Sequence, residues 1–198
     1  MCCARPVSAR SELSRSLIKS KIHRVHVLTD LTRIGDAYRW FHGKVSDRPT
    51  NFSWIISGKL AGCGLPVTHL EFQWLLDQGV KSIVTVREVP LPEEWLGDGI
   101  SYKHLQVEDY GAPSLEDLDD AVNFMKAQIA AERPVTVHCA AGKGRTGVVL
   151  AAYMVNTQGI SAKQAIADLR SMRPGSVQSE TQEMAVSMYE KFVNSKQL

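Results

Sequence analysis

Residues 135–154 constrain the fold more than any other part of the chain, because they combine an apolar strand, a short loop and an apolar helix. The run Val135–Val137 is typical of a buried strand, and an apolar helical stretch follows from Val148. Between them, Gly142 and Gly144 permit a tight turn, since glycine has no Cβ to obstruct unusual backbone angles. Such a loop directs backbone N–H groups inward at a helix N-terminus, which makes a seat for a tetrahedral oxyanion.

Cys139 and Arg145 stand at the two ends of this loop. A free thiol titrates near ~8.5, and a helix N-terminus together with a nearby cation lowers that value by several units. An arginine in the first turn of a helix is disfavoured by the helix dipole unless it meets an anion. The pattern therefore indicates a nucleophile and an anion-binding cation at one site. The alternative, a buried cysteine beside a surface arginine, leaves the rest of the loop unexplained.

The segment from His138 to Thr146 resembles the signature of the cysteine-dependent protein tyrosine phosphatases, which is His-Cys, five residues, Arg, then Ser or Thr. The order of predicted elements between about residues 51 and 191 is similar to that of the dual-specificity phosphatases. Three segments resemble the small atypical subfamily of dual-specificity phosphatase 23 in particular: Asn51-Phe52-Ser53-Trp54, Leu60-Ala61-Gly62 and Arg173-Pro174-Gly175-Ser176.

This resemblance implies that Cys139 attacks phosphorus and that no metal or other cofactor is needed. We expect Arg145 to bind two phosphoryl oxygens through its planar fork, which a lysine does not reproduce. We expect Thr146 to donate its hydroxyl to the departing sulfur and His138 to orient the loop rather than act as a base. The phosphate seat is expected to comprise Ala140, Ala141, Gly142, Lys143, Gly144 and Arg145.

A proton donor is also required, because the leaving oxygen is otherwise too basic to depart. Asp109 follows a predicted strand and precedes Cys139 by 30 residues. In the family that the chain resembles, the acid lies on such a loop at about that distance. Glu108 is the competing carboxylate, but adjacent residues of an extended segment point to opposite sides, so only one faces the pocket. A solvated turn carboxylate is the alternative for Asp109.

Strands alternate with helices along residues 51–194, which predicts an α/β fold: a single domain with a largely parallel central sheet flanked by helices. Capping signals predict where several helices begin. The expected strands are 52–56, 59–61, 81–86, 102–107 and 135–137, and the expected helices are 69–78, 115–131, 145–158, 162–172 and 180–194. The reactive loop leaves the carboxyl end of a strand, where ligands of such sheets usually bind.

The first 27 residues differ from the rest in composition. They contain six basic side chains, five serines and one acidic residue, Glu12. We expect a flexible basic tail over residues 1–27, an N-terminal extension over 28–50 and a phosphatase domain over 51–194. The same arginine- and serine-rich, acid-poor composition is typical of an organelle transit peptide, so a mitochondrial location is the minor alternative to the cytoplasm and nucleus.

Composition excludes several classes of protein. The four cysteines do not form a disulfide framework in a chain of 198 residues, and no Cys/His cluster has zinc spacing. No apolar run approaches the ~20 residues that span a bilayer, so no transmembrane segment is expected. Nucleic acid is not an expected partner, because the basic residues gather in the tail without an accompanying aromatic stripe.

The resemblance implies a dual-specificity protein phosphatase that acts on phosphotyrosine, phosphoserine and phosphothreonine through a phosphocysteine intermediate. Lys143 makes the loop similar to that of the phosphoinositide phosphatases, although Ala140 stands where that family has a second lysine. Phosphoinositides or inositol phosphates are therefore the alternative substrates, and a non-catalytic phosphate-binding module is the alternative from another class. In related enzymes a second cysteine protects the first by a disulfide, a role open to Cys63, and a glutamine positions water, a role open to Gln178 or Gln182.

Overall fold

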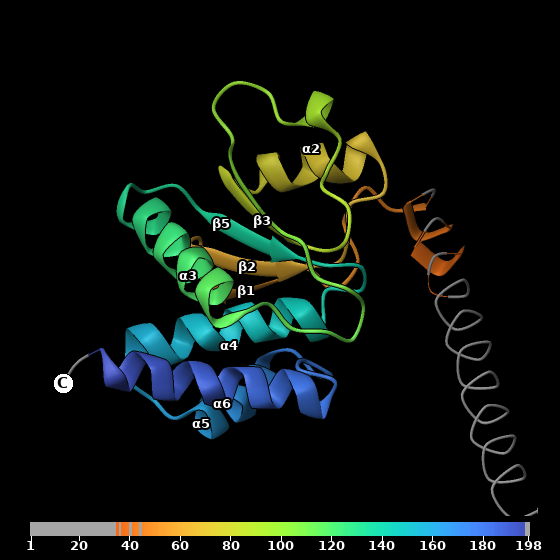
Figure 1. Cartoon of the computed structure of the whole chain (residues 1–198). Helices are drawn as coiled ribbons and strands as arrows, with labels where there is room; N and C mark the ends of the chain where they lie inside the picture. The colour runs from red at the N-terminus through yellow and green to blue at the C-terminus, as the bar shows by residue number, and fades with distance from the viewer. Residues whose placement is uncertain (1–34, 36, 40, 44, 197–198) are drawn as a thin grey trace, which may run out of the picture. The chain divides into compact units, whose positions relative to one another are not determined.

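The computed structural model describes residues 35, 37–39, 41–43 and 45–196. It divides into two compact units, residues 1–41 and residues 42–198. The second unit holds all the elements considered below (Figure 1). The expected tail over residues 1–27 lies outside the described residues.

The second unit is built on a five-stranded sheet in the order β1-β2-β5-β3-β4. The strands are β1 (Ser53–Ile56), β2 (Leu60–Cys63), β3 (Ser82–Val86), β4 (Ser101–Leu105) and β5 (Val135–His138). Only β1 pairs antiparallel, through the turn that joins it to β2, and the remaining neighbours are parallel. This confirms the predicted largely parallel sheet, with β5 and its reactive loop at the centre.

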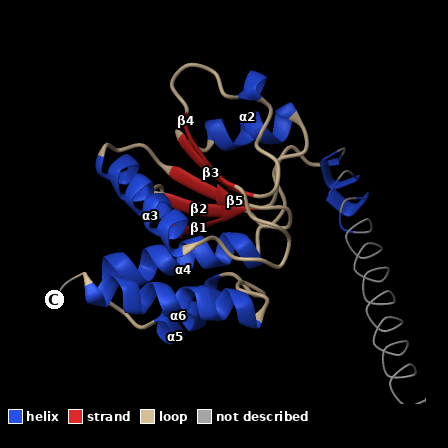
Figure 2. Cartoon of the chain, in the orientation of Figure 1, coloured by secondary structure: helices blue, strands red, loops and turns tan. Residues whose placement is uncertain are grey.

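Helices cover both faces of the sheet. Figure 2 shows α2 on one face and α3 and α4 on the other, with α5 and α6 packed against α4. Their bounds are α2 His69–Asp77, α3 Leu115–Ala130, α4 Gly144–Gln158, α5 Ala162–Met172 and α6 Glu180–Ser195. Because α4 lies between the sheet and two further helices, nearly all of its residues are buried.

The sheet separates two hydrophobic cores, and β3 shows how. Its five residues are all buried, as is typical of an inner parallel strand. Ile83 points into the core formed with α2, whereas Val84 and Val86 point into the larger core formed with α3, α4 and α6. The alternation follows the two-residue period of strand side chains.

Side chains cap four helices as the sequence predicts. Thr68, Ser114, Ser161 and Ser179 each accept a hydrogen bond from the backbone N–H three residues further on. Such caps satisfy N–H groups that the first turn of a helix leaves without partners. At the other end of α4, Gly159 takes the left-handed conformation with φ of 66°.

The bounds of most elements differ from prediction by one or two residues. The strand expected over residues 102–107 is Ser101–Leu105; beyond it, the N–H of Val107 donates to the carbonyl of Arg87 (3.2 Å), and the carbonyl of Val107 accepts a hydrogen bond from Arg145 (2.8 Å). The loop expected over residues 88–99 contains one short 3-10 turn, Glu93–Trp95.

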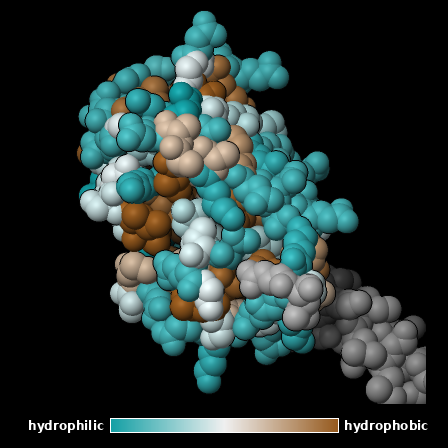
Figure 3. Space-filling model, turned by 90° about the vertical axis from the view of Figure 1, so that its left-hand side faces the viewer, coloured by the Kyte–Doolittle hydropathy of each residue, from teal (hydrophilic) through white to brown (hydrophobic). Residues whose placement is uncertain are grey.

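The surface of the molecule carries both hydrophilic and hydrophobic side chains. Hydrophilic side chains cover most of the face seen in Figure 3, and hydrophobic ones form small patches between them. None of the helices in the described residues combines the length and the apolar character that a membrane-spanning segment needs.

Candidate active site

The loop between β5 and α4 requires glycine at residue 142. Gly142 has φ of 72°, and a Cβ there would collide with the backbone of Cys63, the last residue of the neighbouring strand β2, and of Gly64 directly after it. At Gly144 a Cβ would approach the side-chain amide of Gln182 to 2.9 Å. Both glycines therefore let the loop pack closely against segments that support it from outside.

Three consecutive carbonyl groups of the loop, at residues 140–142, accept hydrogen bonds from outside the loop. The donors are the N–H of Leu65 to Ala140 (3.0 Å), Nδ2 of Asn51 to Ala141 (2.7 Å) and Nη2 of Arg173 to Gly142 (2.6 Å). In a trans peptide the N–H points opposite to the C=O. The N–H groups of residues 141–143 are consequently directed toward the interior of the loop, as the predicted oxyanion seat requires.

Cys139 lies at the base of this loop with 3% of its surface exposed. Behind it, His138 is fully buried, with Nε2 2.7 Å from Oγ1 of Thr85 and Nδ1 3.4 Å from the carbonyl oxygen of Cys139. Burial lowers the pKa of His138 to about 3, so its imidazole is neutral near pH 7. This fits the expectation that His138 supports the loop and does not act as a base.

The hydroxyl of Thr146 is buried and has no hydrogen-bond partner among the described residues. Buried polar groups usually have a partner, so an unpaired one calls for an explanation. Thr146 lies in the first turn of α4, directly after Arg145. An unpaired donor in this position is free to serve the cysteine sulfur, as the sequence predicts.

Arg145 is almost completely buried, with 3% of its side chain exposed. Its Nη1 donates to the carbonyl of Val107 (2.8 Å) and to Oε1 of Glu88 (2.9 Å). Its Nη2 donates to Oδ1 of Asp109 (3.0 Å). Both terminal nitrogens of the guanidinium, which is expected to bind a phosphoryl group, are thus paired with carboxylates.

Glu88 is a site residue that the sequence analysis missed, because it was treated as part of a connecting loop. Burial opposes ionisation of Glu88, but its own backbone N–H and the charge of Arg145 together hold the pKa of its carboxyl below the usual value. One signal was present in the sequence. Glu88 follows the carboxyl end of β3, which neighbours β5, and parallel strands bring such positions to one edge of the sheet.

Of the two adjacent carboxylates, Asp109 and not Glu108 reaches Arg145. The side chain of Asp109 is 47% exposed, and that of Glu108 forms no hydrogen bond or ion pair in the described part of the chain. The loop after Asp109 is held by α6, because Ser179 donates to the carbonyl of Tyr110 (3.1 Å) and Gln182 to that of Gly111 (3.0 Å).

The two glutamines are placed differently. Gln182 is buried, and its amide is committed to backbone groups of Gln178 (2.7 Å) and Gly111 (3.0 Å). Gln178 is exposed, and its Oε1 would lie 3.0 Å from a Cβ at Gly144, so its side chain extends over the loop. Of this pair, Gln178 is the one with a side chain free to position a water molecule.

The disulfide considered between Cys63 and Cys139 is not formed in this structure. Both are free thiols. Cys63 belongs to the core on the α2 side of the sheet and Cys139 to the core on the opposite side. Burial raises the pKa of Cys63 to about 12, and its sulfur lies 3.8 Å from Oγ1 of Thr136. Cys63 is thus held as the neutral thiol, and its disulfide with Cys139 stays a prediction.

Among the described residues, no group of His, Cys, Asp or Glu side chains is arranged to hold a metal ion. Lys143 is half-buried, and its aliphatic stem lies against Gly175. Lys143 thus adds a positive charge to the loop, as Arg145 and Arg173 do beside it.

The family model described as "PTP-SAK: Swiss Army Knife protein, DSP-PTPase phosphatase domain" matches residues 49–186. The chain belongs to this family. It therefore carries a phosphatase domain of the dual-specificity type within the cysteine-dependent protein tyrosine phosphatases, as the loop signature indicates.

Two curated relatives illustrate the similarity. "Protein tyrosine phosphatase domain-containing protein 1" of Bos taurus is 30% identical over 179 residues, which cover 80% of this chain and 22% of the relative. The chain thus spans about a fifth of the length of that protein. "Phosphatidylglycerophosphatase and protein-tyrosine phosphatase 1" of Homo sapiens is 30% identical over 154 residues, which cover 70% of this chain and 76% of the relative.

Solved structures agree on the fold. The crystal structure of Tk-PTP in the active form matches with a TM-score of 0.65 and 26% identity, over 71% of this chain and 97% of that one. The crystal structure of PTPMT1 in complex with PI(5)P matches with a TM-score of 0.67 and 22% identity, over 75% and 99%.

The ion pair between Asp109 and Arg145 predicts competition with an incoming anion. Asp109→Asn should bind tungstate about two- to fivefold more tightly, because a partly exposed ion pair that opposes binding is worth up to ~1 kcal/mol. Isothermal titration calorimetry measures the change. Glu108→Gln is the matched control, since it removes the same charge one residue away without touching Arg145. Equal tightening in both variants would contradict direct competition.

Proposed function

We propose that the chain hydrolyses phosphomonoesters in two steps through a phosphocysteine at Cys139. The observation that carries this proposal is the arrangement of the loop around the cysteine. Its peptide N–H groups are directed to the interior, and the buried Arg145 follows the loop in the first turn of α4. Fixed donors of this kind stabilise the charge that spreads over the equatorial oxygens of a transferring phosphoryl group.

In the first step, Cys139 Sγ forms a bond to phosphorus while the bond from phosphorus to the leaving oxygen breaks. Once the substrate has displaced Asp109 from Arg145, the carboxylate of Asp109 takes up a proton from solvent, and Asp109 donates that proton to the leaving oxygen. The dianion replaces the carboxylate of Asp109 on the fork of Arg145, since a bidentate phosphoryl contact is stronger than a single carboxylate contact. Because the side chain of Asp109 is half-exposed, it is free to swing from Arg145 toward the leaving group.

In the second step, the carboxylate of Asp109 takes a proton from water, the water oxygen bonds to phosphorus, and the bond from phosphorus to sulfur breaks. Thr146 donates its unpaired hydroxyl to the departing thiolate. Gln178 extends over the loop and is placed to orient the water. Glu88 keeps its contact with Arg145 throughout and so fixes the plane of the guanidinium.

We propose phosphorylated proteins or peptides as the substrates, with phosphotyrosine, phosphoserine and phosphothreonine all accepted. Glu88 and Asp109 place two carboxylates beside Arg145. Negative charge there disfavours close approach to an anionic membrane surface. The short phosphatase domain, which the family model matches over residues 49–186, also favours a shallow pocket that admits aliphatic as well as aromatic phosphoesters.

Phosphoinositides are the second candidate. Lys143 adds a cation inside the loop. A similar human protein is called phosphatidylglycerophosphatase and protein-tyrosine phosphatase 1, and a similar fold has been solved in complex with PI(5)P.

Chemical trapping tests the mechanism. Wild-type protein mixed with p-nitrophenyl phosphate and quenched in acid should carry one phosphoryl group on Cys139, detectable by peptide mass mapping. Cys139→Ser should lose the adduct and at least about 10³-fold in turnover, as nucleophile removal generally does. Cys63→Ser, the matched control, should retain both. Turnover that survives in Cys139→Ser would contradict the proposal.

A second assay separates the substrate classes. We expect kcat/KM for phosphotyrosine and phosphothreonine peptides to exceed that for short-chain phosphatidylinositol phosphates by about tenfold or more, which corresponds to ~1.4 kcal/mol of transition-state binding. A reversed ranking would favour the lipid alternative and leave the phosphocysteine mechanism intact.

A further inference from the structure

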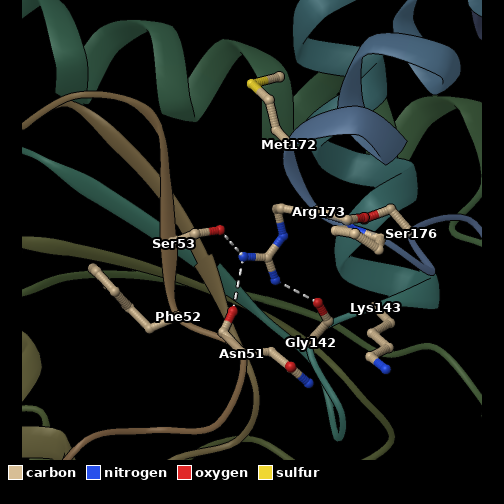
Figure 4. Close-up of a pocket in the computed structure, with 9 residues that line it drawn as sticks. Asn51, Phe52, Ser53, Gly142, Lys143, Met172, Arg173 and Ser176 are labelled. Carbon is tan, nitrogen blue, oxygen red and sulfur yellow. Dashed lines mark hydrogen bonds between the residues drawn. The ribbon is translucent and has the colours of Figure 1, made fainter.

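Arg173 lies at the carboxyl end of α5, outside the machinery of the proposed reaction. Only 6% of its surface is exposed. Its guanidinium donates to the carbonyls of Asn51 (2.8 Å), Gly62 (2.8 Å) and Gly142 (2.6 Å), and also to the hydroxyl of Ser53. Figure 4 shows this guanidinium between β1 and the phosphate loop, with the bonds to Asn51, Ser53 and Gly142 drawn.

The bond to Gly142 fixes the direction of one peptide group. Because Arg173 draws the carbonyl of Gly142 out of the loop, the N–H of Lys143 on the same peptide is directed into it. Asn51 acts similarly on the preceding peptide, and the carbonyl of Asn51 is in turn bound by Arg173. One guanidinium therefore supports two adjacent peptides of the anion seat.

The charge of Arg173 is also unusual. Within the described part of the chain, its guanidinium forms no ion pair with a carboxylate, and its bonds go to carbonyls and one hydroxyl. Burial lowers the pKa of Arg173, while the nearby thiols of Cys63 and Cys139 oppose that effect. A buried cation without a counter-ion is costly. Arg145, by contrast, already contacts two carboxylates.

We propose that Arg173 is a positioning residue of the phosphate loop, which fixes the peptide of Gly142 and Lys143 with its N–H inward and places an uncompensated positive charge behind the bound anion. The proposal rests on the proposed function, because it assigns a role in binding the same phosphoryl group. In the absence of a carboxylate partner, the bound dianion and the cysteine thiolate are the charges that Arg173 balances.

Arg170 offers a matched control on the same helix. It holds the turn that follows Arg173, through the carbonyls of Ser176 (3.1 Å) and Val177 (2.7 Å). It is 43% exposed, is paired with Glu183, and contacts no residue of the phosphate loop. Arg170→Met therefore disturbs the same turn without changing the peptides or the charge behind the anion.

Tungstate, a phosphate analogue, tests the role in binding. Titration calorimetry on the full chain should show that Arg173→Met weakens tungstate binding about tenfold or more, since a hydrogen bond that involves a charged group is lost. Arg173→Lys keeps the charge without the fork and should recover part of this loss. Arg170→Met should stay within about twofold of wild type, as is usual for exposed positions. Circular dichroism defines a temperature at which every variant is folded.

The alkylation rate of Cys139 tests the role of the charge. At pH 6.5, iodoacetamide should label Cys139 more slowly in Arg173→Met than in wild type, by about threefold or more, because a nearby cation favours the thiolate. Arg173→Lys and Arg170→Met should label at nearly the wild-type rate. Peptide mass mapping distinguishes Cys139 from the other cysteines.

The outcomes separate this proposal from the proposed function. Wild-type tungstate binding in folded Arg173→Met, or an equal loss in Arg170→Met, would overturn the role of Arg173 and leave the phosphatase mechanism standing. If wild-type protein binds no tungstate, and tungstate does not protect Cys139 from alkylation, the proposed function itself fails. Should Arg173→Met not fold, Arg173→Lys is compared with Arg170→Lys, and weaker tungstate binding is expected only in the former.

Discussion

The outward hydrogen bonding of three successive carbonyls, at residues 140–142, is the constraint on which the site depends. Each of these carbonyls is held by a different part of the domain: the segment after β2, the turn before β1, and the end of α5. Because these carbonyls are held outside the loop, the peptide N–H groups already face inward before an anion binds. Anion binding therefore requires no rearrangement of the loop backbone. The glycine at 142 is needed because β2 leaves no room for a Cβ.

Two buried arginines supply positive charge to the site in different ways. Arg145 faces the pocket and shares its guanidinium with Glu88 and Asp109, so its charge is balanced before any ligand binds. Arg173 lies behind the loop and is surrounded by carbonyl oxygens. The first arrangement makes anion binding an exchange of one negative group for another, which limits the desolvation that binding requires. The second supplies a positive potential that no described side chain cancels.

Much of this could be predicted from local sequence. Capping side chains define the starts of four helices, and the apolar runs define the strands, because both signals act over a few residues. The loop signature predicted Arg145, the spacing from Cys139 predicted Asp109, and the fold brings these two side chains together. The competition between Asp109 and Glu108 was settled only by the path of the backbone after β4, which places Asp109 on Arg145.

The supports of the loop could not be predicted, because they act over long distances in the sequence. Arg173 contacts Asn51 from 122 residues away, and Asn51 contacts Ala141 from 90 residues away. The local sequence around Asn51, Ala141 and Arg173 does not indicate which residue each of them contacts. The surroundings of Cys63 could not be predicted either, because the strand register decides that it packs in the core on the α2 side of the sheet.

A crystal structure of the protein with bound vanadate tests the central claim most directly. The account predicts vanadium bonded to Cys139 Sγ, with equatorial oxygens within hydrogen-bond distance of the N–H groups of residues 141–143 and of the fork of Arg145. It also predicts that Asp109 has left Arg145 while Glu88 remains in contact. Vanadate bound elsewhere, or a loop whose carbonyls turn inward, would contradict it.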